Sequence, residues 1–172
     1  MMKVNKKASM MLTIGLALLV VVIAGILING KINKVSDQEI AAPGKDWPSQ
    51  RKVEDYFIES LRFTQEDLER QKQREAVSFR PGNGSTIEAI VSNLHYYGFV
   101  RSEKVLMYTL ERTEDKTPGN PGFLSVGKNG SVDINASYRI SENMTAWELA
   151  DTLLNKSQYF GDNDPYHYMF MP

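Results

Sequence analysis

Glu88 and Glu148 hold the positions in this sequence where acid chemistry would first be sought. Glu88 follows Ser85 by three residues, and Glu148 follows Thr145 at the same spacing. At this spacing a hydroxyl caps the first turn of a helix, and the carboxylate returns a hydrogen bond to the cap. An enzyme that cleaves sugar bonds needs instead a protonated acid in a cleft, usually with a second carboxylate nearby. Because capping accounts for both glutamates, we expect no catalytic residue and no enzymatic activity.

Residues that bind metal ions or cofactors are sparse. The two histidines, His95 and His167, each lack a second ligand at the spacing of a metal site. The segment Asp162-Asn163-Asp164 begins like a calcium-binding loop, but the later Gly and Glu of such a loop are missing. The chain has no Cys, which excludes disulfides, thiolate metal sites and a cysteine nucleophile. We therefore expect no metal site and no cofactor.

Aromatic side chains are the best candidates for a binding function. Rings beside Asn and Ser suit glycans, because a sugar stacks on an aromatic face while its hydroxyls form hydrogen bonds. We predict a glycan-binding surface built from Asn83, Tyr96 and Tyr97. The alternative is that most of the rings pack in the core or at its rim. The aromatic residues considered are Tyr96, Tyr97, Phe99, Tyr108, Tyr138, Trp147, Tyr159, Phe160, Tyr166, Tyr168 and Phe170.

The N-terminal segment differs in composition from the rest of the chain. Residues 8–30 carry no charge, and their number is close to the roughly 20 apolar residues that a membrane-spanning helix needs. Lysines precede this segment at positions 3, 6 and 7, which places the N-terminus in the cytoplasm under the positive-inside rule. We predict a cytoplasmic tail at 1–7, a single transmembrane helix at 8–30 that contacts membrane lipid, and an extracytoplasmic remainder.

The remainder of the chain is acidic. From Val35 onward, 15 Lys and Arg face 21 Asp and Glu, a formal charge of −6. A protein that binds nucleic acid needs a basic face, so we expect no nucleic-acid partner.

Residues 31–75 are predicted to be a linker followed by an amphipathic helix. The helix should run from Gln50 to Val77, with many charges around a narrow apolar stripe. In one interpretation it is a coiled-coil stalk or a helix that binds a partner; in the other it packs on its own domain or is a solvated spacer. The stripe consists of Val53, Phe57, Leu61 and Leu68.

Residues 76–156 have the pattern of a small α+β domain. Short strands are predicted at Ala76–Phe79 and Tyr138–Ile140, each followed by a capped helix that starts at Ser85 or Thr145. Gly98 supplies the left-handed residue that ends the first of these helices. Further expected elements are a helix from Ser102 to about Arg112, a hairpin of Phe123–Val126 and Ser131–Ile134 around Asn129-Gly130, and one sheet joining the four strands.

The two strand–helix units have matching positions, which suggests two copies of one unit. The aromatic tail at 157–172 is expected either to dock a partner or to return to the sheet as an edge strand. The matching pairs, counted from the predicted caps, are Ile87 and Trp147, Ile90 and Ala150, and Leu94 and Leu154.

Four motifs carry a family resemblance. They are VSFRPGNGSTIEAI at 77–90, GFVRS at 98–102, ASYRI at 136–140 and MTAWELADTL at 144–153. Together they resemble the N-terminal part of the YceG-like family, the endolytic murein transglycosylases, over about residues 76–156. The resemblance implies a bacterial protein with a cytoplasmic tail, one transmembrane helix and a LysM-like module that contacts peptidoglycan.

The departures from this family bear on catalysis. The catalytic glutamate of the family lies in a domain after the LysM-like module, and this sequence ends at Pro172 without such a segment, so no catalytic residue is carried over. Ala136 and Asn143 also stand where the family usually has Gly. The predicted fold class is α+β, with one N-terminal transmembrane helix, a helical stalk, and a small LysM-like domain of short strands with two or three packed helices.

Three hypotheses for function follow from the sequence. The first is a membrane-anchored extracytoplasmic protein that binds peptidoglycan without a catalytic site of its own. The second is a membrane-tethered interaction or regulatory protein of the cell-wall or division machinery. The third is a truncated endolytic murein transglycosylase.

Overall fold

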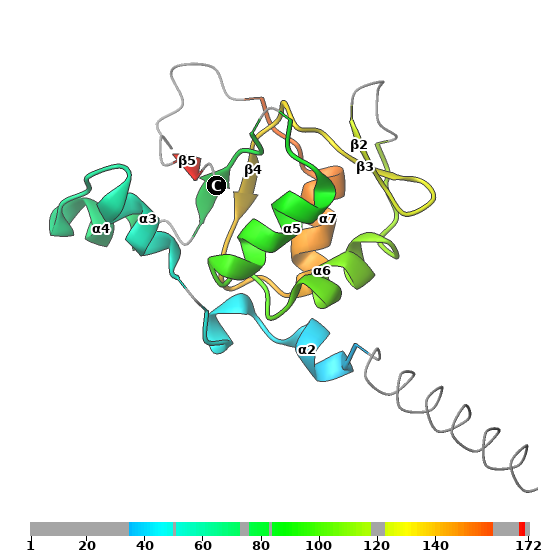
Figure 1. Ribbon diagram of the computed structural model, residues 1–172, viewed down its shortest axis with the longest axis horizontal. Helices are drawn as coiled ribbons and strands as arrows, with labels where there is room; N and C mark the ends of the chain where they lie inside the picture. Colours follow the sequence, from blue (N-terminus) through cyan, green and yellow to red (C-terminus); the bar gives the residue numbers. More distant parts are fainter. Residues whose placement is uncertain are drawn as a thin grey trace, which may run out of the picture. The chain divides into compact units, whose positions relative to one another are not determined.

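Figure 1 shows the computed structural model of the chain, which divides into residues 1–34 and residues 35–172. The residues that the structure describes are 35–49, 51–72, 76–82, 84–117, 123–159 and 169–170. The predicted cytoplasmic tail and transmembrane helix, at 1–7 and 8–30, lie outside them.

The described residues form a small α+β fold of helices and short strands. None of the helices in these ranges is both long enough and apolar enough to cross a membrane. The predicted fold class, which combined a transmembrane helix, a helical stalk and a LysM-like domain, is therefore wrong for this structure. In place of the stalk there are two short helices that pack on the domain.

A strand, two helices and a returning strand make the centre of the fold. β1 (Val77–Phe79) pairs antiparallel with β4 (Tyr138–Ile140). Between these strands the chain forms α5 (Ile87–Tyr96) and α6 (Glu103–Leu110). α7 (Ala146–Asn155) follows β4, and the three helices gather to one side of the strands in Figure 1.

The last described residues return to the sheet. β5 (Met169–Phe170) pairs parallel with β1, which gives the strand order β4-β1-β5. Of the two alternatives predicted for the tail, the edge strand is therefore present at these two residues. Earlier in the tail, the backbones of Ser137 and Gln158 exchange hydrogen bonds of 2.8 and 2.9 Å.

The predicted single sheet of four strands is wrong, because the hairpin forms a sheet of its own. β2 (Leu124–Val126) pairs antiparallel with β3 (Gly130–Val132), and the turn between them places Gly127 at φ 56°. The Asp115 carboxylate ties the hairpin to the loop after α6, since it accepts hydrogen bonds from the backbone and hydroxyl of Ser131 at 2.9 and 3.0 Å. The two strands contact α5 and α7, so the hairpin packs on the helices instead of extending the sheet.

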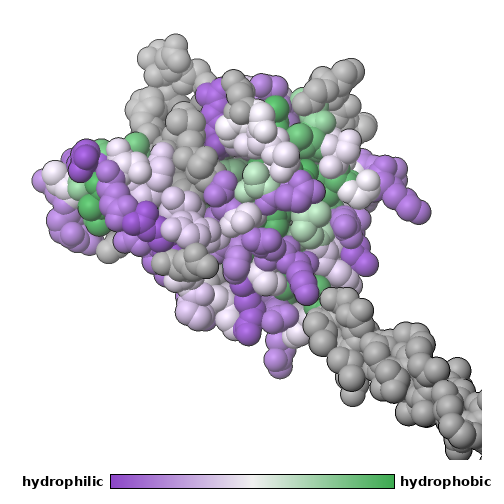
Figure 2. Space-filling view, in the orientation of Figure 1, coloured by the Kyte–Doolittle hydropathy of each residue, from purple (hydrophilic) through white to green (hydrophobic). Residues whose placement is uncertain are grey.

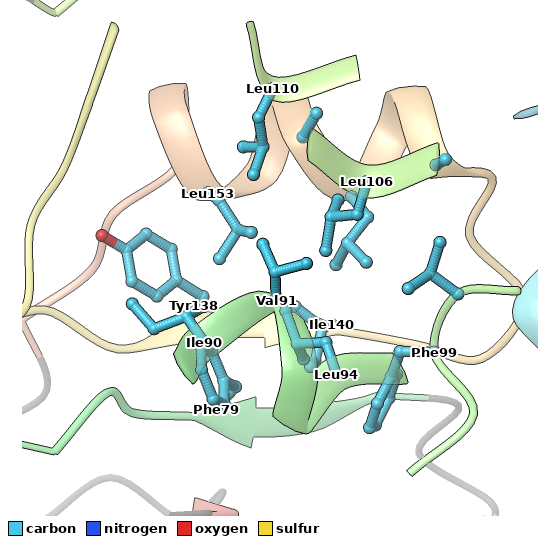
Figure 3. Close-up of a cluster of buried hydrophobic side chains, with 14 of the residues drawn as sticks. Phe79, Ile90, Val91, Leu94, Phe99, Leu106, Leu110, Tyr138, Ile140 and Leu153 are labelled. Atoms are coloured by element: carbon cyan, nitrogen blue, oxygen red, sulfur yellow. The ribbon is translucent and has the colours of Figure 1, made fainter. Parts of the chain in front are cut away.

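Figure 3 shows the core between the helices and the β1–β4 pair. Tyr138 is fully buried, and burial raises the pKa of its hydroxyl. That hydroxyl donates a 2.7 Å hydrogen bond to the Asp133 carbonyl, which satisfies the one polar atom of the side chain. The other core residues labelled in Figure 3 are Phe79, Ile90, Val91, Leu94, Phe99, Leu106, Leu110, Ile140 and Leu153.

Helix α5 starts one residue later than the sequence pattern predicts. Its N-cap is Thr86, whose Oγ1 accepts a hydrogen bond from Ala89 N at 3.2 Å. The predicted cap, Ser85, instead donates its backbone N–H to the Gly82 carbonyl in a turn. The predicted capping box of Ser85 and Glu88 is therefore wrong. Glu88 still has a local structural role, because hydrogen bonds from its own backbone N–H and from the Thr86 hydroxyl lower the pKa of its carboxyl.

The end of α5 and the start of α7 are as predicted. Gly98 has φ 82° and ends α5, and the Phe99 N–H returns to the Leu94 carbonyl at 2.9 Å. At α7, Thr145 Oγ1 accepts from Glu148 N at 3.3 Å, while the Glu148 carboxylate accepts from Thr145 N at 2.8 Å. This capping box is confirmed, and its hydrogen bonds lower the pKa of Glu148.

The buried positions of α5 and α7 do match, but only when they are counted from the observed N-caps and not from the predicted ones. The predicted frame paired buried Ile87 with Trp147, which is 41% exposed. Counted from the observed caps, Thr86 and Thr145, four positions coincide and are buried in both helices. The pairs in this frame are Ile87 and Ala146, Ile90 and Leu149, Val91 and Ala150, and Leu94 and Leu153.

Residues 35–72 precede the sheet and form four short helices. Phe57 and Leu68 from this region are buried, so the last two helices pack on their own domain, which is the second of the two predicted interpretations. We call these two helices and the turn between them the α3–α4 arm. The four are α2 (Asp37–Ala41), the 3₁₀-helix η1 (Gly44–Asp46), α3 (Val53–Glu59) and α4 (Gln65–Lys72).

The predicted continuous helix from Gln50 to Val77 is wrong for a local reason. Arg62 has φ 60°, a left-handed backbone that a helix cannot contain. Thr64 then begins a new helix, since its Oγ1 accepts from Asp67 N at 3.2 Å and the Asp67 carboxylate accepts from Thr64 N at 2.9 Å.

Candidate functional site

A pocket of about 340 Å³ opens between the α3–α4 arm and the end of β4. We call it the Glu54–Glu142 pocket. A largely apolar wall with a few polar groups is the usual form of a small-molecule site. The apolar lining is Val53, Phe57, Leu68, Ala76, Val77, Phe99 and Ile140. The polar lining is Lys45, Glu54, Ser141, Glu142 and Asn143.

Helix α3 positions Glu54 at this pocket. The Asp55 carboxylate accepts a hydrogen bond from Lys52 N at 3.0 Å, which fixes the first turn of the helix. Val53 and Phe57 are four residues apart on one face, and both are buried. Glu54 follows Val53 at the edge of that buried face, and its partial burial brings a charged group to the pocket.

The turn after β4 positions Glu142. Asn143 N donates to the Ser141 hydroxyl at 3.2 Å, which closes the turn on itself. The Glu142 carbonyl accepts from Lys45 N at 2.8 Å, so η1 holds the turn from the other side. The backbone that carries the Glu142 side chain is thus fixed by two separate segments.

The electrostatics of the pocket centre on its two carboxylates. Burial raises the pKa of the Glu142 carboxyl above its ordinary value; the Lys52 ammonium opposes this shift, and nearby Glu54 adds to it. Lys52 Nζ lies 3.8 Å from Glu142 Oε1, which is an ion pair but too long for a hydrogen bond. Glu142 Oε1 and Glu54 Oε2 are buried atoms without a hydrogen-bond partner among the described residues.

A series of ring contacts joins the pocket to two residues predicted from the sequence. Tyr96 and Tyr97 meet edge to face at 5.0 Å between ring centroids, and Tyr97 meets Tyr56 at 6.2 Å. Tyr56 meets Phe57 at 6.0 Å, and Phe57 both lines the pocket and stacks on Phe63 at 5.1 Å. The three tyrosines are half-buried, and burial raises the pKa of Tyr97. They combine packing with partial exposure beside the pocket.

The structure describes two of the three residues predicted to bind glycan, Tyr96 and Tyr97. Asn83 lies outside the described residues. Its neighbours Gly82 and Gly84 precede the N-terminal end of α5, whereas Tyr96 and Tyr97 lie at its C-terminal end. At 1.5 Å per residue, the ten residues of α5 separate the two ends by about 15 Å. The glycine turn and the tyrosine pair therefore lie at opposite ends of α5.

Glu54 and Glu142 are the pocket residues that the sequence pattern did not identify. Glu54 lies in a charged helical segment of the kind that indicates a solvated face. Glu142 lies between Ser141 and Asn143 in a polar turn directly after a buried strand. This abrupt change from a buried strand to three polar residues is the one local signal that could have pointed to the site.

The remaining candidate ligands are not brought together by the described residues. His95 Nδ1 lies 3.9 Å from Glu103 Oε1, and both side chains are exposed, so they form a surface pair. His167 and the segment 162–164 lie outside the described residues. Within the described ranges, no group of three or more His, Asp or Glu side chains could hold a metal ion.

Comparison of the chain with protein-family models, with curated proteins and with solved structures finds no match. The resemblance to the YceG-like family stays a hypothesis that rests on the four motifs. The pocket offers an apolar wall, buried hydrogen-bond acceptors and neighbouring aromatic rings. Such an arrangement suits the binding of a ligand that has both an apolar face and polar donors.

Proposed function

We propose that the chain binds cell-wall glycan, and that the glycan contacts the Glu54–Glu142 pocket and the adjoining tyrosines. The observation that carries this proposal is the two-sided lining of the pocket, in which an apolar wall faces carboxylate, hydroxyl and amide groups. A sugar ring has matching chemistry, since its C–H face packs on aromatic rings and its hydroxyls form hydrogen bonds. The motif resemblance to the YceG-like family favours peptidoglycan as the glycan.

The proposal is one of binding, without cleavage, at the cell envelope. Glu142, with its raised pKa, and Glu54 place two carboxyl groups at the pocket. Cleavage would also require these groups to flank a glycosidic bond at a defined separation, whereas binding needs only the pocket lining. The location follows from the motif resemblance and from the uncharged residues 8–30. Cell fractionation should recover the chain with the envelope, and recovery with the cytoplasm would contradict the location.

Sedimentation with isolated sacculi tests the binding proposal. The full chain, purified in mild detergent, should appear in the pellet at micromolar concentration. Asn143→Ala should reduce the pelleted fraction several-fold, because it removes a polar group from the pocket rim. Asn129→Ala, at another exposed Asn, in the β2–β3 turn, is the matched control and should sediment like the unmodified chain. Failure of the unmodified chain to sediment, or equal loss in both variants, would contradict the proposal.

A second candidate function is the binding of a protein partner by the α3–α4 arm. Ile58 and Leu61 are 46% and 39% exposed, and Figure 2 shows hydrophobic surface in this region, at the left of the view. Exposed apolar side chains close together are a feature of interaction sites. A photo-crosslinking residue at position 58 should capture a protein of the cell-wall or division machinery, and one at the exposed position 66 should not. Equal capture at both positions, or none, would count against this candidate.

A further inference from the structure

We propose that the outer edge of β1, the edge away from β4, is a docking site for an extended apolar strand from a partner protein. In the structure the chain's own β5 occupies this edge, so β5 shows the direction and the kind of strand that the site accepts. The inference is independent of glycan binding, and it adds a peptide site beside the Glu54–Glu142 pocket.

The burial of β1 is the first observation. β1 lies between β4 and β5 in the sheet, and Figure 1 shows these two neighbours on its opposite sides. Val77, Ser78 and Phe79 are all buried. Backbone N–H and C=O groups along a buried strand need hydrogen-bond partners at both edges of that strand. The outer edge of β1 therefore needs a strand beside it.

The strand that covers this edge in the structure is short. β5 pairs with β1 through two residues, with Met169 opposite Ser78 and Phe170 opposite Phe79. β4, on the other side, pairs along all three residues of β1. Strands in globular proteins are commonly about five or six residues long, and parallel pairs are slightly weaker than antiparallel ones. A longer strand from a partner would form more backbone hydrogen bonds than β5 and would replace it.

Helix α3 forms the second wall of this docking site, because β5 contacts both β1 and α3. The same two elements supply apolar lining to the adjoining pocket, namely Val77 from β1 and Val53 and Phe57 from α3. When a peptide adds to a sheet edge, its backbone hydrogen bonds give affinity, and neighbouring pockets for its side chains give specificity. The apolar lining therefore favours a partner strand with apolar side chains.

The tail is also attached to the domain at a second place, before β5. The backbones of Ser137 and Gln158 exchange two hydrogen bonds, and the Tyr159 hydroxyl donates to the carboxylate of Asp133, a residue only 3% exposed. These contacts involve neither β1 nor β5. β5 can therefore leave the edge while the start of the tail stays attached, and this tether gives β5 a high effective concentration at the edge.

A variant that cannot form β5 tests the inference. A dye-labelled peptide of residues 166–172 is titrated with the full chain, and fluorescence anisotropy measures its binding. The double variant Met169→Pro/Phe170→Pro lacks both backbone N–H groups of β5, so its β1 edge is open. It should bind the peptide at least about tenfold more tightly than the unmodified chain, because no internal strand competes.

A peptide that carries the same two prolines is the matched control and should not bind, since it cannot form the backbone hydrogen bonds of a strand at these positions. Circular dichroism checks that the double variant keeps its fold. Equal affinity of the double variant and the unmodified chain for the first peptide, or equal binding of the two peptides, would overturn the inference.

A measurement on the unmodified chain keeps the test independent of how the double variant folds. An excess of the unlabelled peptide, added to the isotope-labelled full chain, should shift the backbone NMR signals of β1 and α3, because the peptide displaces β5 from between them. The signals of the β2–β3 hairpin should not move. Shifts that leave Val77, Ser78 and Phe79 unaffected, or no shift at all, would overturn the inference.

Discussion

Lys52 Nζ and Glu142 Oε1 lie 3.8 Å apart at the Glu54–Glu142 pocket. The separation is short enough for charge attraction but too long for a hydrogen bond. The buried Glu142 Oε1 therefore has a cation near it but no hydrogen-bond partner among the described residues. The same carboxyl has a raised pKa and lines the pocket, so its titration bears on the stability of the fold at this site.

The raised pKa of Glu142 predicts a pH-dependent stability. Above the ordinary carboxyl value of 4.5, the folded chain holds a proton that the unfolded chain has released. The contribution of this carboxyl to the free energy of unfolding is therefore full at low pH and is lost as pH rises through the folded-state pKa. The glutamine in Glu142→Gln cannot titrate, so this variant does not lose that contribution. Its free energy of unfolding should therefore increase relative to that of the unmodified chain as pH rises from about 4 to 7.

Urea denaturation across this pH range measures the difference. Glu66→Gln, on an exposed side chain, should show no such trend and serves as the control. A difference between Glu142→Gln and the unmodified chain that does not change with pH would contradict the buried setting of this carboxyl.

The Thr64–Asp67 pair that begins α4 gives a second prediction. Hydrogen bonds from the Thr64 hydroxyl and backbone, with help from Arg70, lower the pKa of Asp67 to about 2. Thr64→Ala should destabilise the chain by about 1 kcal/mol and raise the Asp67 pKa, because the cap and one of these hydrogen bonds are lost. NMR titration of Asp67, together with urea denaturation, measures both effects. Ser60→Ala, at an exposed position in the same turn, should change neither.

Tyr138 gives a third prediction, on the core. Its hydroxyl donates to the Asp133 carbonyl at 2.7 Å inside the fold. Tyr138→Phe should lower the free energy of unfolding by about 1 to 2 kcal/mol, since a buried hydrogen bond is lost and the carbonyl loses its donor. Tyr159→Phe removes a hydroxyl that donates to the Asp133 carboxylate from a residue 71% exposed, and should cost less. Equal losses in the two variants would contradict the burial of Tyr138.

A pair of glycines gives a fourth prediction, which concerns the packing of η1 against the backbone of Gly98 and Phe99. A Cβ at Gly44 would lie 2.5 Å from the backbone oxygens of Gly98 and Phe99, whereas a Cβ at Gly84 would meet nothing within 4 Å. Gly44→Ala should therefore lower the free energy of unfolding by more than about 2 kcal/mol, because the two backbone segments must move apart. Gly84→Ala should cost only about 1 kcal/mol, from its φ of 82°. Thermal denaturation that ranks Gly84→Ala as the more damaging change would contradict this packing.

Local signals in the sequence predicted much of the central fold. Gly98 and the Thr145–Glu148 pair act within a few residues of themselves, so the helix end and the capping box could be read directly. The start of α5 was misplaced because Ser85 and Thr86 are both good caps, and only the backbone turn decides between them. The break at Arg62 was missed because the charged segment around it is an equally good helix pattern.

The pocket could not be predicted in this way, because several distant parts of the chain form it. Glu54 belongs to α3, Phe99 follows α5, Glu142 follows β4, and Lys45 belongs to η1. No local pattern states that these segments meet. Tyr96 and Tyr97 were identified by residue type alone, and their place beside the pocket depends on the ring of Tyr56 from another helix.

NMR mapping of soluble peptidoglycan fragments on the isotope-labelled full chain tests the central claim most directly. Glycan binding at the pocket predicts that the backbone signals of Glu54, Phe57 and residues 141–143 shift on titration, and that those of the β2–β3 hairpin do not. The absence of any shift, or shifts confined to surfaces away from Glu54 and Glu142, would contradict it.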